Sequence, residues 1–144
     1  MTTHILEVLM VEDDPADAEL TQELLGETDL LVNFNIVNDG VKAVSYLRRE
    51  GDYAKSTLPD LILLDLNLPR KDGREVLQEI KSDQSLKHIP VIILTTSDAE
   101  DDIVKSYKLG ASAFITKPVG LKQYAKIVHS IENFWFKVVR FPAR

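Results

Sequence analysis

The sequence predicts an α/β fold in which helices cover both faces of one parallel sheet. Short apolar runs alternate along the chain with longer stretches of helical periodicity, which is typical of repeated βα units. One run, Leu61–Leu64, is continuously aliphatic, as in a strand that is buried on both faces. Two of the runs end in carboxylates. The expected fold is therefore a doubly wound parallel sheet whose functional groups lie at one edge.

Five apolar runs of strand length account for the sheet. Pro90 stands directly before the fourth run, at a position where a strand can begin. Right-handed crossovers between such strands most simply give the flavodoxin-like strand order 2-1-3-4-5. The strands are expected at Leu6–Val11, Val32–Val37, Leu61–Leu64, Val91–Leu94 and Ala113–Ile115.

Five helices are expected between and after these strands. The first has the clearest boundaries, because Asp14 can cap it, Pro15 suits the first helical position and Gly26 can end it. The helices are expected at Pro15–Leu25, Val41–Arg49, Gly73–Ser82, Ala99–Leu109 and Leu121–Val138.

Length and composition limit the class of protein. A chain of 144 residues with 44% hydrophobic and 28% charged residues predicts one globular domain over residues 1–144. A formal net charge of −6 and the lack of a basic arm argue against nucleic-acid binding. No segment reaches 18 apolar residues and no signal-like start is present, so we expect no membrane association and a cytoplasmic location.

Carboxylates follow two strands that the predicted order makes neighbours. The first strand runs into Glu12-Asp13-Asp14, and the third runs into Asp65. Two like charges about 4 Å apart cost roughly 4 kcal/mol at an effective dielectric near 20. A hard divalent cation such as Mg²⁺ offsets this repulsion, because it takes oxygen ligands. We assign Asp14 to the helix cap and leave it out of the cation site.

Two other strand ends add groups of complementary character. The fourth strand offers the hydroxyls of Thr95 and Thr96, which alternation along a strand places on opposite sides. The fifth strand leads into Lys117 followed by Pro118. Three acids, a cation, a hydroxyl and a lysine suit one task, which is to hold a phosphoryl group on a carboxylate.

This set of residues resembles the receiver domain of two-component response regulators over essentially the whole chain. The match consists of Glu12-Asp13, Asp65, Thr95 and Lys117-Pro118, each at a strand end and in this order. The family pattern favours Thr95 over Thr96. The resemblance implies that Asp65 accepts a phosphoryl group from a phosphohistidine on a sensor histidine kinase.

The resemblance also assigns roles to single residues. It implies a Mg²⁺ site in which Asp13 and Asp65 bind through their side chains, Glu12 acts largely through water and Asn67 gives its backbone carbonyl. Lys117 and Thr95 would contact the phosphoryl oxygens. Thr95 and Phe114 would form the switch, with the aromatic ring turning inward as the hydroxyl moves.

A narrower resemblance is to single-domain regulators that serve cyanobacterial phytochromes. It rests on the run from Asp65 to Leu77, on the loop Gly51-Asp52-Tyr53 and on the segment Ile131-Glu132-Asn133-Phe134-Trp135. It implies a photoreceptor histidine kinase, a bacterial phytochrome, as phosphodonor.

The last helix and the tail, residues 121–144, predict a partner surface. One helical face is mostly apolar and should cover the sheet; it comprises Leu121, Tyr124, Ala125, Val128, Ile131, Glu132 and Trp135. Ile127, Phe134 and Phe136 fall outside that face and form the expected interface of a homodimer built on the fourth and fifth helices. In the alternative, the tail from Val138 to Pro142 folds back over these side chains.

Other functions fit the residues less well. A phosphatase of the haloacid dehalogenase class carries a second aspartate two residues after the nucleophile, where this chain has Asn67. A flavin or nucleotide binder needs a small-residue phosphate loop after the first strand, where Glu12-Asp13-Asp14 would repel the ligand. A scaffold of the same fold that is never phosphorylated would not need the intact set. We therefore expect a phosphoacceptor without enzymatic turnover beyond its own phosphorylation and dephosphorylation.

Overall fold

The computed structural model describes residues 5–26 and 31–143. Five parallel strands form one sheet in the order β2-β1-β3-β4-β5, which confirms the predicted topology. Two strands extend one residue further than predicted. The strands are β1 (Leu6–Val11), β2 (Val32–Val37), β3 (Leu61–Leu64), β4 (Val91–Thr95) and β5 (Ala113–Thr116).

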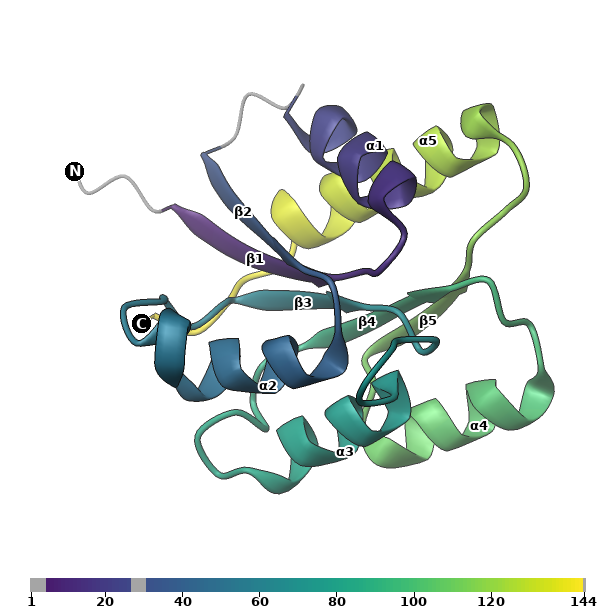
Figure 1. Cartoon of the computed structure of the whole chain (residues 1–144). Coiled ribbons are helices and arrows are strands. Elements are labelled where there is room, and N and C mark those ends of the chain that lie inside the picture. Colours follow the sequence, from purple (N-terminus) through teal and green to yellow (C-terminus); the bar gives the residue numbers. More distant parts are fainter. Residues whose placement is uncertain (1–4, 27–30, 144) are drawn as a thin grey trace.

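Helices cover both faces of this sheet (Figure 1). Helices α1 and α5 lie on one face, and α2, α3 and α4 lie on the other. Asp14 caps α1 as predicted, because its side chain accepts the backbone N–H groups of Ala16 and Asp17. The helices are α1 (Pro15–Leu25), α2 (Gly40–Arg48), α3 (Gly73–Ser82), α4 (Glu100–Leu109) and α5 (Leu121–Ile131), with a short 3-10 turn η1 (Gly51–Tyr53) and a π-helical turn η2 (Glu132–Phe136).

The sheet separates two hydrophobic cores, because successive strand residues point to opposite faces. On β1, Leu9 and Val11 belong to the core beneath α2, α3 and α4, called here the α2–α4 core. Val8 and Met10 belong to the core beneath α1 and α5, called the α1–α5 core. Strand β3 is fully buried on both sides, as its unbroken aliphatic sequence predicts.

The fifth helix departs from the prediction in two ways. Its regular α-helical part ends at Ile131, and the following turn is π-helical. A π turn holds one more residue than an α turn and so changes which side chains face the sheet. Trp135 and Phe136 both pack partly against the α1–α5 core, while Phe134 is 53% exposed. Leu121 was predicted to cover the sheet, but it lies at the start of the helix and is 65% exposed.

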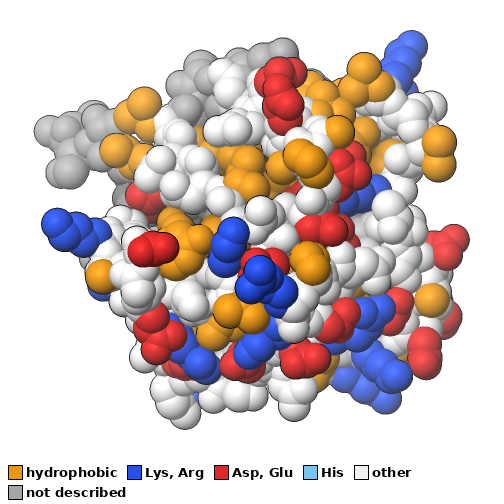
Figure 2. Space-filling view, viewed as in Figure 1, with side chains coloured by type: hydrophobic (Ala, Val, Ile, Leu, Met, Phe, Trp, Pro, Cys, Tyr) orange, Lys and Arg blue, Asp and Glu red, His pale blue; other side chains and the backbone are white. Residues whose placement is uncertain are grey.

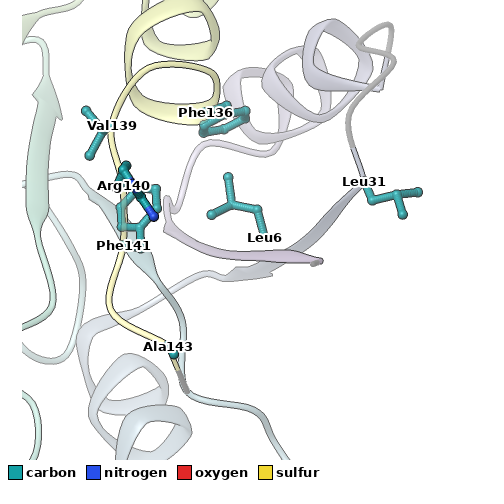
Figure 3. A pocket seen from close by; sticks show the side chains of 7 residues that line it. All are labelled: Leu6, Leu31, Phe136, Val139, Arg140, Phe141 and Ala143. Carbon is teal, nitrogen blue, oxygen red and sulfur yellow. The ribbon is translucent and has the colours of Figure 1, made fainter. Parts of the chain in front are cut away.

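The C-terminal tail passes along the amino edge of the sheet, opposite the strand ends that carry the acids (Figures 1 and 3). Phe141 packs partly against the α1–α5 core. Together with Phe136 and Val139 it lines a pocket of about 330 Å³ beside Leu6, the first residue of β1 (Figure 3). The tail therefore folds back in part, as in the alternative considered for this segment.

Acidic and basic side chains are interspersed over the face seen in Figure 2 rather than gathered into one patch. Among the residues that the structure describes, no helix has the length and apolar character that a membrane span requires.

Candidate functional site at the carboxyl edge of the sheet

The strand register brings the two acidic segments together. Val11 of β1 pairs with Leu64 of β3, so the residues that follow them, Glu12 and Asp65, leave the sheet side by side. The backbone N–H of Asp65 donates to the carbonyl of Val11 at 3.1 Å and continues the pairing past the end of β3. The predicted meeting of the two segments is therefore a consequence of the strand order.

Three carboxylates form a cluster at this edge. Glu12, Asp13 and Asp65 each offer an oxygen atom, and these atoms lie within 4.8 Å of one another. Glu12 and Asp65 are buried, whereas Asp13 is exposed at the mouth of the cluster. The set fits a hard divalent cation, which takes oxygen ligands and keeps several waters on its open side.

Lys117 reaches into the same cluster from the end of β5. Its ammonium Nζ contacts a carboxylate oxygen of Glu12 and lies 3.0 Å from Asp17 Oδ2 and 3.4 Å from Asp65 Oδ2. Only 4% of this side chain is exposed. A buried ammonium surrounded by carboxylates is held ready to meet the negative charge of an incoming group.

Burial and charge have opposite effects on the two partners of this contact. Desolvation raises the pKa of Glu12 to about 7, although the hydrogen bond and charge of Lys117 act against it. Desolvation lowers the pKa of Lys117, but the hydrogen bond and charge of Glu12, with Asp65 and Asp17, outweigh it, so the net direction is upward. Lys117 therefore stays a cation in this site, whereas burial favours the neutral form of Glu12 and the charge of Lys117 opposes it.

The loop after β3 is folded tightly around Asp65. The backbone N–H of Asn67 donates to Asp65 Oδ1 at 3.1 Å, which holds one carboxylate oxygen in place. Gly73, the first residue of α3, packs against this loop so closely that a Cβ atom there would lie 2.2 Å from the backbone oxygen of Asp65. The position of the aspartate thus depends on a glycine eight residues later in the chain.

Thr95 lies at the end of β4, next to β3 and β5. It is fully buried, whereas Thr96 is exposed, so the two hydroxyls lie in different environments. The backbone oxygen of Thr95 accepts the N–H of Lys117 at 2.6 Å, and its Oγ1 accepts the N–H of Ser97 at 3.4 Å. The hydroxyl and the ammonium are therefore carried by directly bonded segments.

Comparison with known proteins identifies this arrangement. The sequence profile of the response regulator receiver domain matches residues 8–129. The chain belongs to this family. A curated relative, the response regulator Rcp1 of Synechocystis sp., is 48% identical over 94% of this chain and 92% of its own length. Another, a probable methanogenesis regulatory protein FilR2 of Methanothrix harundinacea, is 35% identical over 94% of this chain and 86% of its own.

Solved structures of two response regulators superpose closely on this receiver domain. The phosphorylated cyanobacterial phytochrome response regulator RcpA superposes with a TM-score of 0.94, at 50% identity over 97% of this chain and all of that one. The Mn²⁺-bound form of Rcp1 gives the same TM-score, at 48% identity over 96% of this chain and 99% of that one. The narrower resemblance seen in the sequence is thereby confirmed, and a metal-bound relative accords with the acidic pocket of this receiver.

Phe114, the predicted switch aromatic, lies in the middle of the receiver's last strand. It is partly buried and packs against the α2–α4 core. Its backbone N–H donates to the hydroxyl of Tyr107 on α4 at 3.2 Å. The residue thus links β5 to α4.

Sequence reasoning missed a set of contacts beside the pocket. Asp102 of α4 accepts Arg74 Nη2 of α3 at 2.7 Å and Ser97 Oγ at 2.6 Å, so it joins α3, α4 and the β4–α4 loop. These contacts lower the pKa of Asp102, with the Ser97 bond acting first and Arg74 second. Asp17 was missed as well; the available signal was an acid in the first turn of a helix that starts at the carboxyl edge.

The expected interface residues occupy different environments. Ile127 and Phe136 are half-buried and pack partly against the α1–α5 core, while Phe134 is mostly exposed. The ring of Phe134 meets that of Trp135 edge-on, with centroids 5.8 Å apart. Phe134 is therefore the member of this group that presents most of its surface to the outside.

Proposed function

We propose that Asp65 accepts a phosphoryl group from a histidine kinase in a Mg²⁺-dependent reaction. The observation that carries this proposal is the contact of one buried aspartate with a buried lysine inside a cluster of three carboxylates. In this site Asp13 and Asp65 would hold the cation through their side chains, Glu12 would act largely through water, and Asn67 would contribute its backbone carbonyl.

The transfer is a substitution at phosphorus. An oxygen of Asp65 attacks the phosphorus atom, the bond from phosphorus to the imidazole nitrogen of the kinase breaks, and its electron pair stays on that nitrogen. A bound Mg²⁺ supplies charge that offsets the phosphoryl oxygens. Lys117 takes a second region of that charge, and the Thr95 hydroxyl takes a third.

The receiver then changes its partner surface. Phosphorylation adds roughly one to two negative charges next to Lys117. We propose that Thr95 moves toward the phosphoryl group, that Phe114 turns inward into the space so vacated, and that α4 and the β4–α4 loop respond. The hydrogen bonds of Thr95 to the backbones of Lys117 and Ser97 support a link from the pocket to β5 and to the β4–α4 loop.

The kinase is proposed to be a bacterial phytochrome acting in the cytoplasm. The likeness to RcpA, a cyanobacterial phytochrome response regulator, supports this choice. The whole chain, residues 1–144, acts as one receiver domain and transmits its signal by protein contact, without nucleic acid or membrane.

A purified phytochrome kinase with radiolabelled ATP tests the choice of kinase directly: label should move to the receiver at different rates in darkness and in red light. Transfer from acetyl phosphate but from no phytochrome would contradict the choice of kinase alone.

The phosphoacceptor itself is tested with a small donor. Incubation with acetyl phosphate and Mg²⁺ should give a retarded band on Phos-tag electrophoresis, and omission of Mg²⁺ should remove it. Asp65→Asn should take up no phosphate while it unfolds in urea at a midpoint close to that of the wild type. Asp52→Asn, a change of the same kind at an exposed position of η1, is the matched control and should be labelled normally. Full labelling of Asp65→Asn would overturn the assignment.

A homodimer through α4, α5 and the segment up to residue 144 is proposed as the assembled form. Phe134 and Val138, exposed by 53% and 65%, support an apolar contact there, flanked by Ile127 and Phe136. Sedimentation velocity at micromolar concentration should show a dimer that Phe134→Asp converts to a monomer. Tyr107→Asp changes an exposed residue of α4 and should also weaken the dimer, because the proposed interface includes that helix. A wild-type monomer in both phosphorylation states would contradict the proposal.

A further inference from the structure

Lys117 has a carboxylate partner outside the cation cluster. Asp17, in the first turn of α1, lies closer to its ammonium than Asp65 does, at 3.0 Å against 3.4 Å. The group of acids arranged for a cation among the described residues consists of Glu12, Asp13 and Asp65, and Asp17 is not a member. Asp17 therefore contacts the ammonium without belonging to the acids arranged for a cation.

The turn that carries Asp17 is anchored on α5. Thr21 Oγ1 donates to the backbone oxygen of Asp17 at 2.7 Å and lies 2.5 Å from the hydroxyl of Tyr124. A hydroxyl has one hydrogen to donate, so Tyr124 must be the donor in the second bond. Both Thr21 and Tyr124 are buried. This chain of bonds joins α1 to α5 and fixes the position from which Asp17 reaches Lys117.

A cation in the pocket competes with Lys117 for its other partners. Glu12 and Asp65, which the ammonium contacts here, are also two of the three acids arranged for a cation. A divalent cation and an ammonium repel each other strongly at the same oxygens. A cation bound there would draw on the carboxylates of Glu12 and Asp65, whereas Asp17 would remain a partner of Lys117 alone.

We propose that Asp17 is a positioning residue, which holds the Lys117 ammonium beside Asp65 while a divalent cation occupies the acid cluster. The inference rests on the proposed phosphoacceptor role of Asp65 and adds a residue to it. Without Asp17, the ammonium would keep only Glu12 and Asp65, the two acids that it shares with the cation. It would then be held less firmly beside Asp65, which slows phosphorylation.

The first test compares variants by their rate of labelling with acetyl phosphate at saturating Mg²⁺. Asp17→Asn should react about tenfold more slowly, because it removes a charge-assisted hydrogen bond. Asp17→Glu keeps the charge and should recover most of the rate. Glu19→Gln removes one charge from an exposed position of the same helix and should match the wild type. Equal rates for Asp17→Asn and Glu19→Gln would refute the positioning role.

A double-mutant cycle shows whether Asp17 acts through Lys117. In a Lys117→Ala background, Asp17→Asn should cause no further loss of rate. Full additivity of the two losses would overturn the inference. Tyr124→Phe gives an independent variant that keeps every charge and loosens the anchored turn, and we expect a rate about twofold lower. A wild type that takes up no phosphate would instead contradict the proposed function, so the two failures are distinguishable.

Discussion

Two aspartates flank strand β3, and both are 7% exposed, yet they belong to regions of opposite character. Asp60 precedes the strand at the amino edge of the sheet. There its Oδ2 accepts the backbone N–H of Glu7 at 2.9 Å, while its own N–H donates to the Glu7 carbonyl at 2.8 Å. Asp65 follows the strand at the carboxyl edge, where it meets two further carboxylates and Lys117.

The difference shows that the role of a buried aspartate in a parallel sheet depends on which edge of the sheet it occupies. At the amino edge the chain closes over the strand starts, because the tail brings Phe141 and Pro142 beneath them. The carboxyl edge is where open α/β sheets bind their ligands. A buried carboxylate at the first edge completes a backbone pairing, and one at the second edge lies in a cluster of charges. Burial alone does not distinguish the two.

The largest expected effect comes from the backbone at the carboxyl edge. In Gly73→Ala the new Cβ would lie 2.2 Å from the backbone oxygen of Asp65 and 2.6 Å from Leu66 Cα, so the loop must shift. We expect a loss of about 3 kcal/mol in the free energy of unfolding, since backbone atoms cannot yield as a flexible side chain can. Urea denaturation measures this loss, and labelling by acetyl phosphate should fall sharply in the same variant.

Gly26→Ala is the control for that substitution. Its nearest neighbour would be the Gln22 oxygen at 3.2 Å, a tight but tolerable approach at the end of α1. Its labelling rate should equal that of the wild type. A normal labelling rate in Gly73→Ala would show that Asp65 does not depend on the packed loop.

Most of the fold follows from the sequence because its strands are short, apolar and regularly spaced. All five runs form strands within one residue of the predicted ends. The fifth helix was less predictable. Helical periodicity continues past Ile131, but three consecutive aromatic residues cannot all face one core, and the π turn that follows resolves this in a way that periodicity does not encode.

The site was predictable to the extent that it depends on strand order. Glu12, Asp13, Asp65 and Lys117 come together because each follows a strand end, and a parallel sheet aligns those ends. Asp17 lies on a helix, so its approach to Lys117 depends on how α1 is rotated and anchored. The Thr21–Tyr124 bond that anchors it joins positions 103 residues apart, which no local pattern indicates.

A smaller effect is expected at the other end of β3. Asp60→Ala leaves the buried N–H of Glu7 without this acceptor, and the free energy of unfolding should fall by about 2 kcal/mol. Asp60→Asn keeps an acceptor oxygen and should lose less. Both variants should take up phosphate at the wild-type rate. A slowed reaction in either would mean that the two edges are coupled through the strand, and the contrast between them would need revision.

The smallest effect concerns Asp102, the acid of α4 that also contacts α3 and the β4–α4 loop. Ser97 and Arg74 lower the pKa of Asp102, so its contribution to stability is present above the ordinary pKa of an aspartate and is lost as the pH falls through the lowered value. Asp102→Asn removes that dependence. The difference in the free energy of unfolding between wild type and variant should therefore be largest near neutral pH and should shrink as the pH falls below about 4. It should be at most about 1 kcal/mol, because the ion pair of Asp102 with Arg74 is partly exposed. Urea titrations across this range measure it. A difference that stays constant with pH would indicate that packing rather than charge holds α4 against the β4–α4 loop. The carboxyl edge would then resemble the amino edge, where packing orders the chain.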